Sequence, residues 1–395
     1  MGRKMQVMLQ NKNWQLFLIF WIANVVLSIA YKVYYYHTGN HLHYTWLPDM
    51  LFFVLVVLTV ASKEYSLAFL GALLLLLFKA VGSWSIASYY PNKLDLYKDV
   101  IKTWMGYIYI FPLFLFLYKA GDKSSIEIPK YIKHAFVIIA GAIVLSVFVG
   151  LIFPVHIFYT YPNPSRFGIS GVLYPSSYVS YFYMISIVST YLLHKRIPSK
   201  KVYTILLYTL SLAAIFSGTK SIYLFLLVFY TLFVVDNQYY KKKWLWALVG
   251  FVSLGLVVIR HKLASVFHVL VELYRKEDFI TFALSYRNIY AESTWLFVQE
   301  NWTWKNYLIG GLDNVNQLTE MAFVDLFLNF GILGIGLFLF LYYWLIIRHL
   351  KWSYIFLAMT ISIVLIIAIG GNFFDRISHT HWLVLLFLLQ SKARV

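Results

Sequence analysis

The chain alternates between long apolar runs and short polar connections over most of its length. About twelve of these runs approach the roughly 20 residues that a helix needs to cross a membrane. Because apolar and polar positions do not alternate within them, they predict helices and not the strands of a membrane barrel. We expect an all-α integral membrane protein whose residues 1–395 form a single polytopic domain. The predicted spans are 14–30, 47–62, 66–86, 100–118, 134–153, 174–193, 202–217, 221–235, 244–259, 322–347, 352–370 and 377–391.

Composition supports this class and changes how the charge is interpreted. The chain is 61% hydrophobic and 12% charged, whereas about 25% of the residues in soluble domains are charged. A net charge of +17 would indicate nucleic-acid binding in a soluble protein, but membrane proteins collect Lys and Arg in cytoplasmic loops. We therefore expect no nucleic-acid partner. Cysteine is absent, which excludes disulfides and thiolate metal sites. The first run lacks a small-residue cleavage site, so we expect it to remain as a span.

Basic residues are concentrated in alternate connections, and this predicts the orientation of the chain. They occur before the first span, after each even-numbered span and at the C-terminus. Because short basic loops are cytoplasmic, we expect both termini in the cytoplasm. The residues concerned are Arg3, Lys4, Lys12, Lys63, Lys119, Lys123, Lys130, Lys133, Lys195, Arg196, Lys200, Lys201, Lys241, Lys242, Lys243, Arg348, Lys351, Lys392 and Arg394.

One long polar interval, residues 260–321, is predicted to form an extracytoplasmic loop. Within it, 264–276 and 281–300 have the apolar face of helices that lie on a membrane surface. A different polar residue, Lys79, falls inside the third predicted span, where an unpaired charge is costly. We expect Lys79 to form an ion pair, with Asp49 as the candidate partner.

Arg166 precedes two glycines and a proline between the fifth and sixth predicted spans, in Arg166-Phe-Gly-Ile-Ser-Gly-Val-Leu-Tyr-Pro. Gly168 and Gly171 allow the backbone to turn sharply or to approach a ligand closely. A guanidinium can bind phosphate through two parallel hydrogen bonds. The alternative is an arginine that anchors the loop to lipid headgroups.

The tight turn Ser217-Gly-Thr-Lys joins the seventh and eighth predicted spans. Lys220 is a candidate contact for phosphate, and Ser217 and Thr219 are candidate hydroxyl donors. Alternatively, Thr219 caps the start of the next helix, and both interpretations can hold together. The glycine spacing of a P-loop is missing.

Further candidates lie in the long interval. Arg287 stands on the second predicted loop helix, near Tyr286 and Tyr290, and Arg260 opens the interval. We expect the two arginines to contact phosphate and the two tyrosines to contact the substrate. An ordinary solvated helix face is the alternative.

Acidic residues mark the point where the interval re-enters the membrane. Glu320 precedes the tenth predicted span, and Asp325 and Asn329, four residues apart, form a polar stripe within it. A carboxylate at a helix start is favoured by the helix dipole, and an acid inside a membrane is a functional candidate. We expect Glu320 or Asp325 to be catalytic. Alternatively, Glu320 is a cap and Asp325 makes a hydrogen bond between helices.

Another polar group follows the eleventh predicted span. Arg376 is a candidate substrate contact, or it tethers its loop together with Asp375. The nearby His379 and His381 are two residues apart and do not share a helical face. We therefore expect no metal site here.

These outward segments together deliver several cations and one acid to the same predicted side of the membrane. Such a combination suits an anionic, membrane-anchored substrate such as a lipid pyrophosphate, with a carboxylate to accept a proton.

The order of these motifs resembles the O-antigen polymerase and ligase superfamily of bacterial polysaccharide assembly. The resemblance covers residues from about 160 to 350 and is carried by Arg166 to Pro175, Ser217 to Lys220, Arg287, and Gly331 to Gly334. Each motif is short, and it is their order and their common side that make the combination specific.

The resemblance implies a helical bundle of the GT-C type in the bacterial cytoplasmic membrane. It implies transfer of an oligosaccharide from undecaprenyl pyrophosphate without metal or cofactor, with Arg166, Lys220 and Arg287 holding the pyrophosphate. A chain-length regulator protein is an implied partner. The ligase branch has a His-Asn pair eleven residues before Gly331, where this chain has Glu320 followed by Met321. That departure favours the polymerase branch.

Three functions follow as hypotheses. The favoured one is a polymerase that joins lipid-linked repeat units outside the cytoplasm. The second is a ligase with the same chemistry and a lipid or wall acceptor. The third, from another class, is a flippase for lipid-linked sugars, although paired repeats and interrupted spans, which are typical of transporters, are not apparent.

Overall fold

The computed structural model describes residues 3–39, 53–54, 66–90, 92–120, 128–161, 166–173, 176–197, 201–312, 319–371, 373–374 and 377–391. These residues form an all-α protein with 16 helices, joined by turns and short 3-10 segments. The helices are α1 (Arg3–Thr38), α3 (Ser66–Ser85), α4 (Lys93–Ile108), α5 (Ile110–Ala120), α6 (Lys130–Ile152), α7 (Ser176–Arg196), α8 (Lys201–Phe216), α9 (Lys220–Asp236), α10 (Lys243–Val266), α11 (His268–Lys276), α12 (Phe279–Leu284), α13 (Arg287–Asn301), α14 (Trp304–Ile309), α15 (Ala322–Leu345), α16 (Tyr354–Ile369) and α17 (Ile377–Gln390).

Within the described residues, five stretches are long and apolar enough to cross a membrane, which indicates a multi-pass membrane protein. They are Lys12–Thr38, Ala68–Ser85, Lys93–Tyr118, Lys130–Ile152 and Ala322–His349. The expectation of about twelve spans is not confirmed. One physical reason is helix length: α8 and α16 have 16 residues and α17 has 14, fewer than the roughly 20 that crossing requires. The predicted span 47–62 lies outside the described residues, apart from 53–54.

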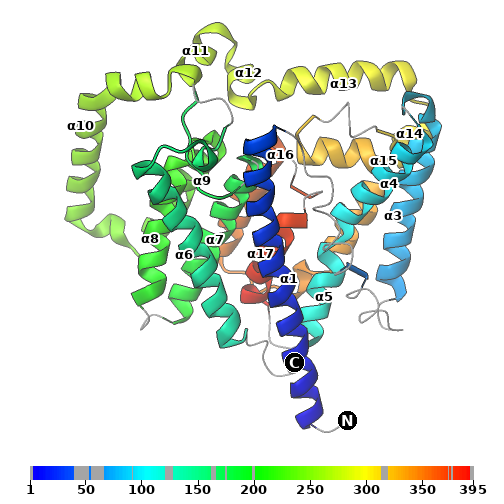
Figure 1. The fold of residues 1–395 in the computed structure, drawn as a ribbon, viewed down its shortest axis with the longest axis horizontal. Helices are drawn as coiled ribbons and strands as arrows, with labels where there is room; N and C mark the ends of the chain where they lie inside the picture. The colour runs from blue at the N-terminus through cyan, green and yellow to red at the C-terminus, as the bar shows by residue number, and fades with distance from the viewer. Residues whose placement is uncertain are drawn as a thin grey trace.

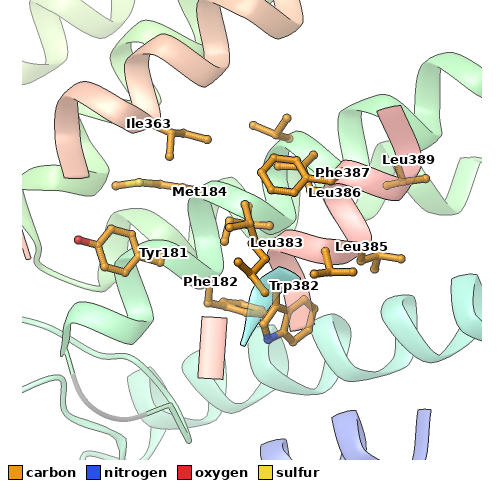
Figure 2. Packing of buried hydrophobic residues seen from close by; sticks show 14 of the residues in the cluster. Tyr181, Phe182, Met184, Ile363, Trp382, Leu383, Leu385, Leu386, Phe387 and Leu389 are labelled. Carbon is orange, nitrogen blue, oxygen red and sulfur yellow. The ribbon is translucent and has the colours of Figure 1, made fainter. Parts of the chain in front are cut away.

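The centre of the bundle is α7, which packs against α8 and α17. Apolar residues and small hydroxyl residues make up its middle, and every residue from Tyr178 to Leu193 is buried, as expected for a helix that other helices surround. Figure 2 shows part of this core, where Phe182 of α7 lies against Trp382 of α17 with ring centroids 4.8 Å apart.

Helix α15 bends at Gly331, whose φ of 66° and ψ of −174° interrupt the helix. A side chain at Gly331 would collide with the backbone of Leu308 at the end of α14, and one at Gly310 would collide with the backbone of Asn329. The two glycines therefore let α14 and α15 touch along their backbones. A Cβ at Gly334 would likewise meet Phe330, so the segment from Gly331 to Gly334 has a packing role.

Helices α11, α12 and α13 cross one end of the bundle, and α1 begins at the opposite end (Figure 1). The predicted loop from residue 260 starts later than expected, because α10 continues without interruption to Val266. The predicted helix over 281–300 is also wrong in its first part. Ser285 and Tyr286 have positive φ angles of 53° and 68°, which end α12 and start α13 at Arg287.

Candidate functional site

The loop that carries Arg166 is fastened to the turn between α8 and α9. The Thr160 amide donates to Gly168 O at 2.9 Å, and the Ile169 amide donates to Phe216 O at 2.7 Å. Thr160 Oγ1 also donates to Ser217 O at 2.8 Å. Two segments that are about 50 residues apart in the chain therefore form one backbone unit.

Glycines make this close approach possible. An added Cβ at Gly168 would lie 2.6 Å from Ser217 O, and one at Gly218 would lie 2.8 Å from the Cα of Gly168 and still closer to Phe167 O. Gly218 also has a φ of 72°, which side chains disfavour. Contact between the two loops thus explains Gly168 and Gly218, whereas a Cβ at Gly171 would meet Ser146 of α6.

Arg166 is half-buried and lies over the ring of Tyr161, with its Cζ 3.8 Å from the ring centroid. Such a contact is favourable for a partly desolvated cation. Its Nε is buried and has no hydrogen-bond partner among the described residues. The Tyr161 hydroxyl donates to Gly218 O at 3.4 Å, so the ring that supports Arg166 also contacts the second loop.

Lys220 is the first residue of α9 and reaches toward α12. Its Nζ donates to Phe282 O and lies 4.0 Å from the centre of the Phe282 ring. Burial, together with the nearby charges of Arg166 and Arg287, lowers the pKa of Lys220 to about 8. Burial raises the pKa of Tyr161, and the same two arginines oppose that rise. Three cations from three segments therefore share one neighbourhood.

Arg287 occupies the first position of α13 and is held by three groups. Its guanidinium donates from Nη1 to Leu284 O at 3.1 Å and from Nε to Glu320 O at 3.0 Å. Its Nη2 lies 3.0 Å from the Glu320 carboxylate. The break at Ser285 and Tyr286 is what brings the guanidinium to this place, because it turns the chain just before Arg287.

Glu320 lies two residues before α15 in an unusual backbone conformation. Its φ is 56°, a left-handed value that costs an L residue about 1–2 kcal/mol. Its carbonyl accepts from Arg287 Nε and from the Gly371 amide, the latter at 2.8 Å. Its side chain is 51% exposed, against 20% for Arg287, so the carboxylate is open to an incoming group while it pairs with the arginine.

Asp325 lies in the first turn of α15 and is buried. Its Oδ1 accepts from the amide and the hydroxyl of Thr319, at 2.9 and 2.8 Å. Asn329, one turn further, donates from Nδ2 to Asp325 O at 2.8 Å. The predicted polar stripe is present, and it faces the interior of the protein.

Two predicted substrate-contacting residues, Ser217 and Thr219, direct their hydroxyl groups away from the cations. Ser217 Oγ donates to Ala214 O at 2.7 Å, and Thr219 Oγ1 accepts from Ser180 Oγ at 3.1 Å. Both hydroxyls are buried and are used inside the bundle. Thr219 is the N-cap residue of α9, but its side chain makes no capping hydrogen bond.

The side chains of three more predicted residues have other partners or face solvent. Tyr286 donates to Glu277 Oε1 at 2.9 Å, and Tyr290 is exposed on α13. Arg260 is exposed on α10, where its Nε contacts His261 at 3.4 Å. No described contact joins Arg260 to the other cations, because it lies within a continuous helix and not in a loop. Arg376 lies outside the described residues.

Two buried lysines make contacts whose partners the sequence did not reveal. Lys32 of α1 donates to Ser170 Oγ at 2.9 Å and to Gly171 O at 2.6 Å, and so anchors the loop of Arg166. The predicted ion pair of Lys79 is present with a different partner: its Nζ lies 3.0 Å from Asp99 of α4. Asp49 lies outside the described residues. A polar residue on an apolar helix was the available signal for both lysines.

Within the described ranges, no group of three or more His, Cys, Asp or Glu side chains is placed to hold a metal ion. Comparison with known proteins finds no family model that matches the chain, no similar curated protein and no similar solved structure. The function of this site therefore rests on its own geometry and chemistry.

Proposed function

We propose that this protein joins lipid-linked oligosaccharide units by glycosyl transfer from an undecaprenyl-pyrophosphate carrier, as a polysaccharide polymerase. The observation that carries the proposal is the meeting of Arg166, Lys220 and Arg287, from three separate segments, beside the half-exposed carboxylate of Glu320. Such a group of cations next to one acid fits a bound pyrophosphate and a reacting hydroxyl.

The cations suit the charge that develops in this reaction. When the bond between the anomeric carbon and the pyrophosphate oxygen breaks, its electron pair remains on the pyrophosphate. Two guanidiniums and one ammonium stabilise that charge most when they are fixed in place beforehand. Their positions are set by the Tyr161 ring, the Phe282 carbonyl and the Leu284 carbonyl, so little reorganisation is required.

Glu320 is the proposed proton acceptor. The hydroxyl of the acceptor sugar attacks the anomeric carbon, the new glycosidic bond forms, and the hydroxyl proton passes to the carboxylate. Before substrate binds, the carboxylate is paired with Arg287. A pyrophosphate that takes over Arg287 would release the carboxylate for this role.

The membrane contributes to the rate. Donor and acceptor are both lipid-linked, and confinement of two reactants to one surface reduces the entropy that must be lost when they meet. The apolar helices that indicate a multi-pass membrane protein support a site that such lipids can reach. The motif order that resembles O-antigen polymerases supports the same reaction.

The test is incubation of purified protein in detergent with a chemically defined, lipid-linked repeat unit, followed by mass spectrometry. Products of two or more repeat units, and their absence with Glu320→Gln, would support the polymerase. Transfer only to an added lipid or wall acceptor would replace it with a ligase. Unchanged substrate, together with movement of the lipid between leaflets of a liposome, would replace it with a flippase.

A further inference from the structure

The segment Thr319–Met321 is wound around the carboxylate of Asp325. Oδ1 of Asp325 accepts from both the amide and the hydroxyl of Thr319. The Met321 amide donates to Thr319 Oγ1 at 3.2 Å, and the Asp325 amide donates to Met321 O at 2.8 Å. Four hydrogen bonds therefore fix the two residues that flank Glu320.

This winding explains how Glu320 keeps its left-handed backbone. A strained conformation of a residue other than glycine persists only when the surrounding structure determines it. On one side, Thr319 is held by Asp325. On the other, the Glu320 carbonyl is held by Arg287 and by the Gly371 amide. The direction in which the Glu320 carboxylate leaves the chain follows from both restraints.

Asp325 is itself held by a buried network below it. Asn329 donates to the Asp325 carbonyl, and its Oδ1 accepts from Lys79 Nζ at 2.7 Å. Lys79 also pairs with Asp99 and donates to Leu312 O at 2.8 Å. The network connects α3 and α4 to the first turns of α15. The part of α15 that contacts the Glu320 segment is therefore held rigidly.

The position of Asp325 disfavours direct contact with substrate. Its residue surface is 2% exposed, and one oxygen already accepts two hydrogen bonds. The side chain of Glu320, in contrast, is 51% exposed. A proton acceptor has to come within hydrogen-bond distance of the hydroxyl that it deprotonates, and of the two acids only Glu320 has that access.

We propose that Asp325 is a positioning residue, which acts through Thr319 to hold Glu320 in place and does not itself accept the proton. This inference rests on the proposed glycosyl transfer for its consequence in turnover, and on the hydrogen bonds alone for its consequence in structure. What matters is then the acceptor oxygen of Asp325, and its negative charge is dispensable.

Two variants separate these roles. Asp325→Asn keeps an acceptor oxygen for Thr319 and removes the charge, whereas Asp325→Leu removes the acceptor. We expect Asp325→Asn to retain kcat to within about threefold, and Asp325→Leu to lose about 100-fold in kcat with little change in KM, because a misplaced catalytic group lowers the rate of the chemical step. Asp95→Asn, which neutralises a solvent-accessible acid on α4, is the matched control and should resemble wild type.

Hydrogen exchange provides a readout that does not depend on activity. The Thr319 amide should be protected in wild type and in Asp325→Asn, and should exchange faster in Asp325→Leu. If Asp325→Leu does not fold, Thr319→Val, which removes only the hydroxyl, should show the same direction to a smaller extent at the Met321 amide.

Each outcome decides a different question. The inference would be overturned if Asp325→Asn were as inactive as Glu320→Gln while the Thr319 amide stayed protected. In that case the negative charge of Asp325 would itself be catalytic. Equal protection of Thr319 in all variants would overturn it on structural grounds. If wild type makes no polymer, the proposed function fails, and the exchange data alone still decide whether Asp325 sets this segment.

Discussion

Substitution of Gly218 by alanine tests whether the contact between the two cation-bearing loops matters for activity. The new Cβ would lie 2.8 Å from the Cα of Gly168 and nearer still to Phe167 O, whereas ordinary contacts begin at 3.4 Å. The loop of Arg166 would therefore have to move by roughly 1 Å relative to Lys220. The positive φ of Gly218 adds about 1–2 kcal/mol of backbone strain.

The consequence for turnover can be estimated from that displacement. A misplacement of about 1 Å can lower a catalysed rate by roughly 100-fold, so we expect Gly218→Ala to lose between 10- and 100-fold in kcat/KM, on the order that such a shift causes. Thermal unfolding in detergent should also move to lower temperature, because the strain is confined to the folded state.

Gly250→Ala is the matched control, because an added Cβ at this position of α10 meets nothing within 4 Å. In a helix interior, alanine is favoured over glycine by about 0.5–1 kcal/mol, so this variant should be active and as stable as wild type or more so. Normal turnover of Gly218→Ala, or equal losses in both variants, would refute the idea that the two loops must approach this closely.

Three further predictions concern charged residues. Burial and the neighbouring arginines lower the pKa of Lys220 to about 8, so its ammonium loses charge as pH rises through that value. The affinity for a prenyl pyrophosphate, measured by calorimetry, should therefore fall between about pH 7 and pH 9. In Lys220→Arg, whose guanidinium stays charged, the affinity should change less over this range. Lys79→Met and Asp99→Asn should each destabilise the fold by about 3–5 kcal/mol in thermal unfolding, because each change leaves a buried charge unpaired. The double variant should be destabilised by clearly less than the sum. Strictly additive effects would contradict an ion pair between Lys79 and Asp99. Lys32→Met should lower turnover about tenfold through the loop of Arg166, and unchanged kinetics would show that the anchor is dispensable.

The sequence pattern was informative about features that depend on a few neighbouring residues. Gly168 predicted a backbone that turns sharply or approaches a ligand closely. In the structure, Gly168 and Gly218 let the two loops touch. Charge placement also predicted that Lys79 is paired. What these cations bind stays a prediction, because no ligand contact follows from their proximity alone.

Other features depend on tertiary structure and left no trace in the pattern. The break before Arg287 uses Ser285 and Tyr286 in positive φ, and neither residue type signals such a conformation. The hydroxyls of Ser217 and Thr219 turn inward because buried backbone and serine groups accept and donate there. Asp99 lies in the second turn of α4, and only the packing of α3 against α4 makes it the partner of Lys79.

The central claim is that Arg166, Lys220 and Arg287 bind one pyrophosphate. The most direct measurement is the affinity of the purified protein for a prenyl pyrophosphate, compared with single alanine variants of these residues and with Lys262→Ala, an exposed cation on α10. A hydrogen bond to a charged group contributes about 1.5–3 kcal/mol, so each of the three variants should bind about 10- to 100-fold more weakly, with Lys262→Ala unchanged. Equal affinity of all four variants and wild type would contradict the account.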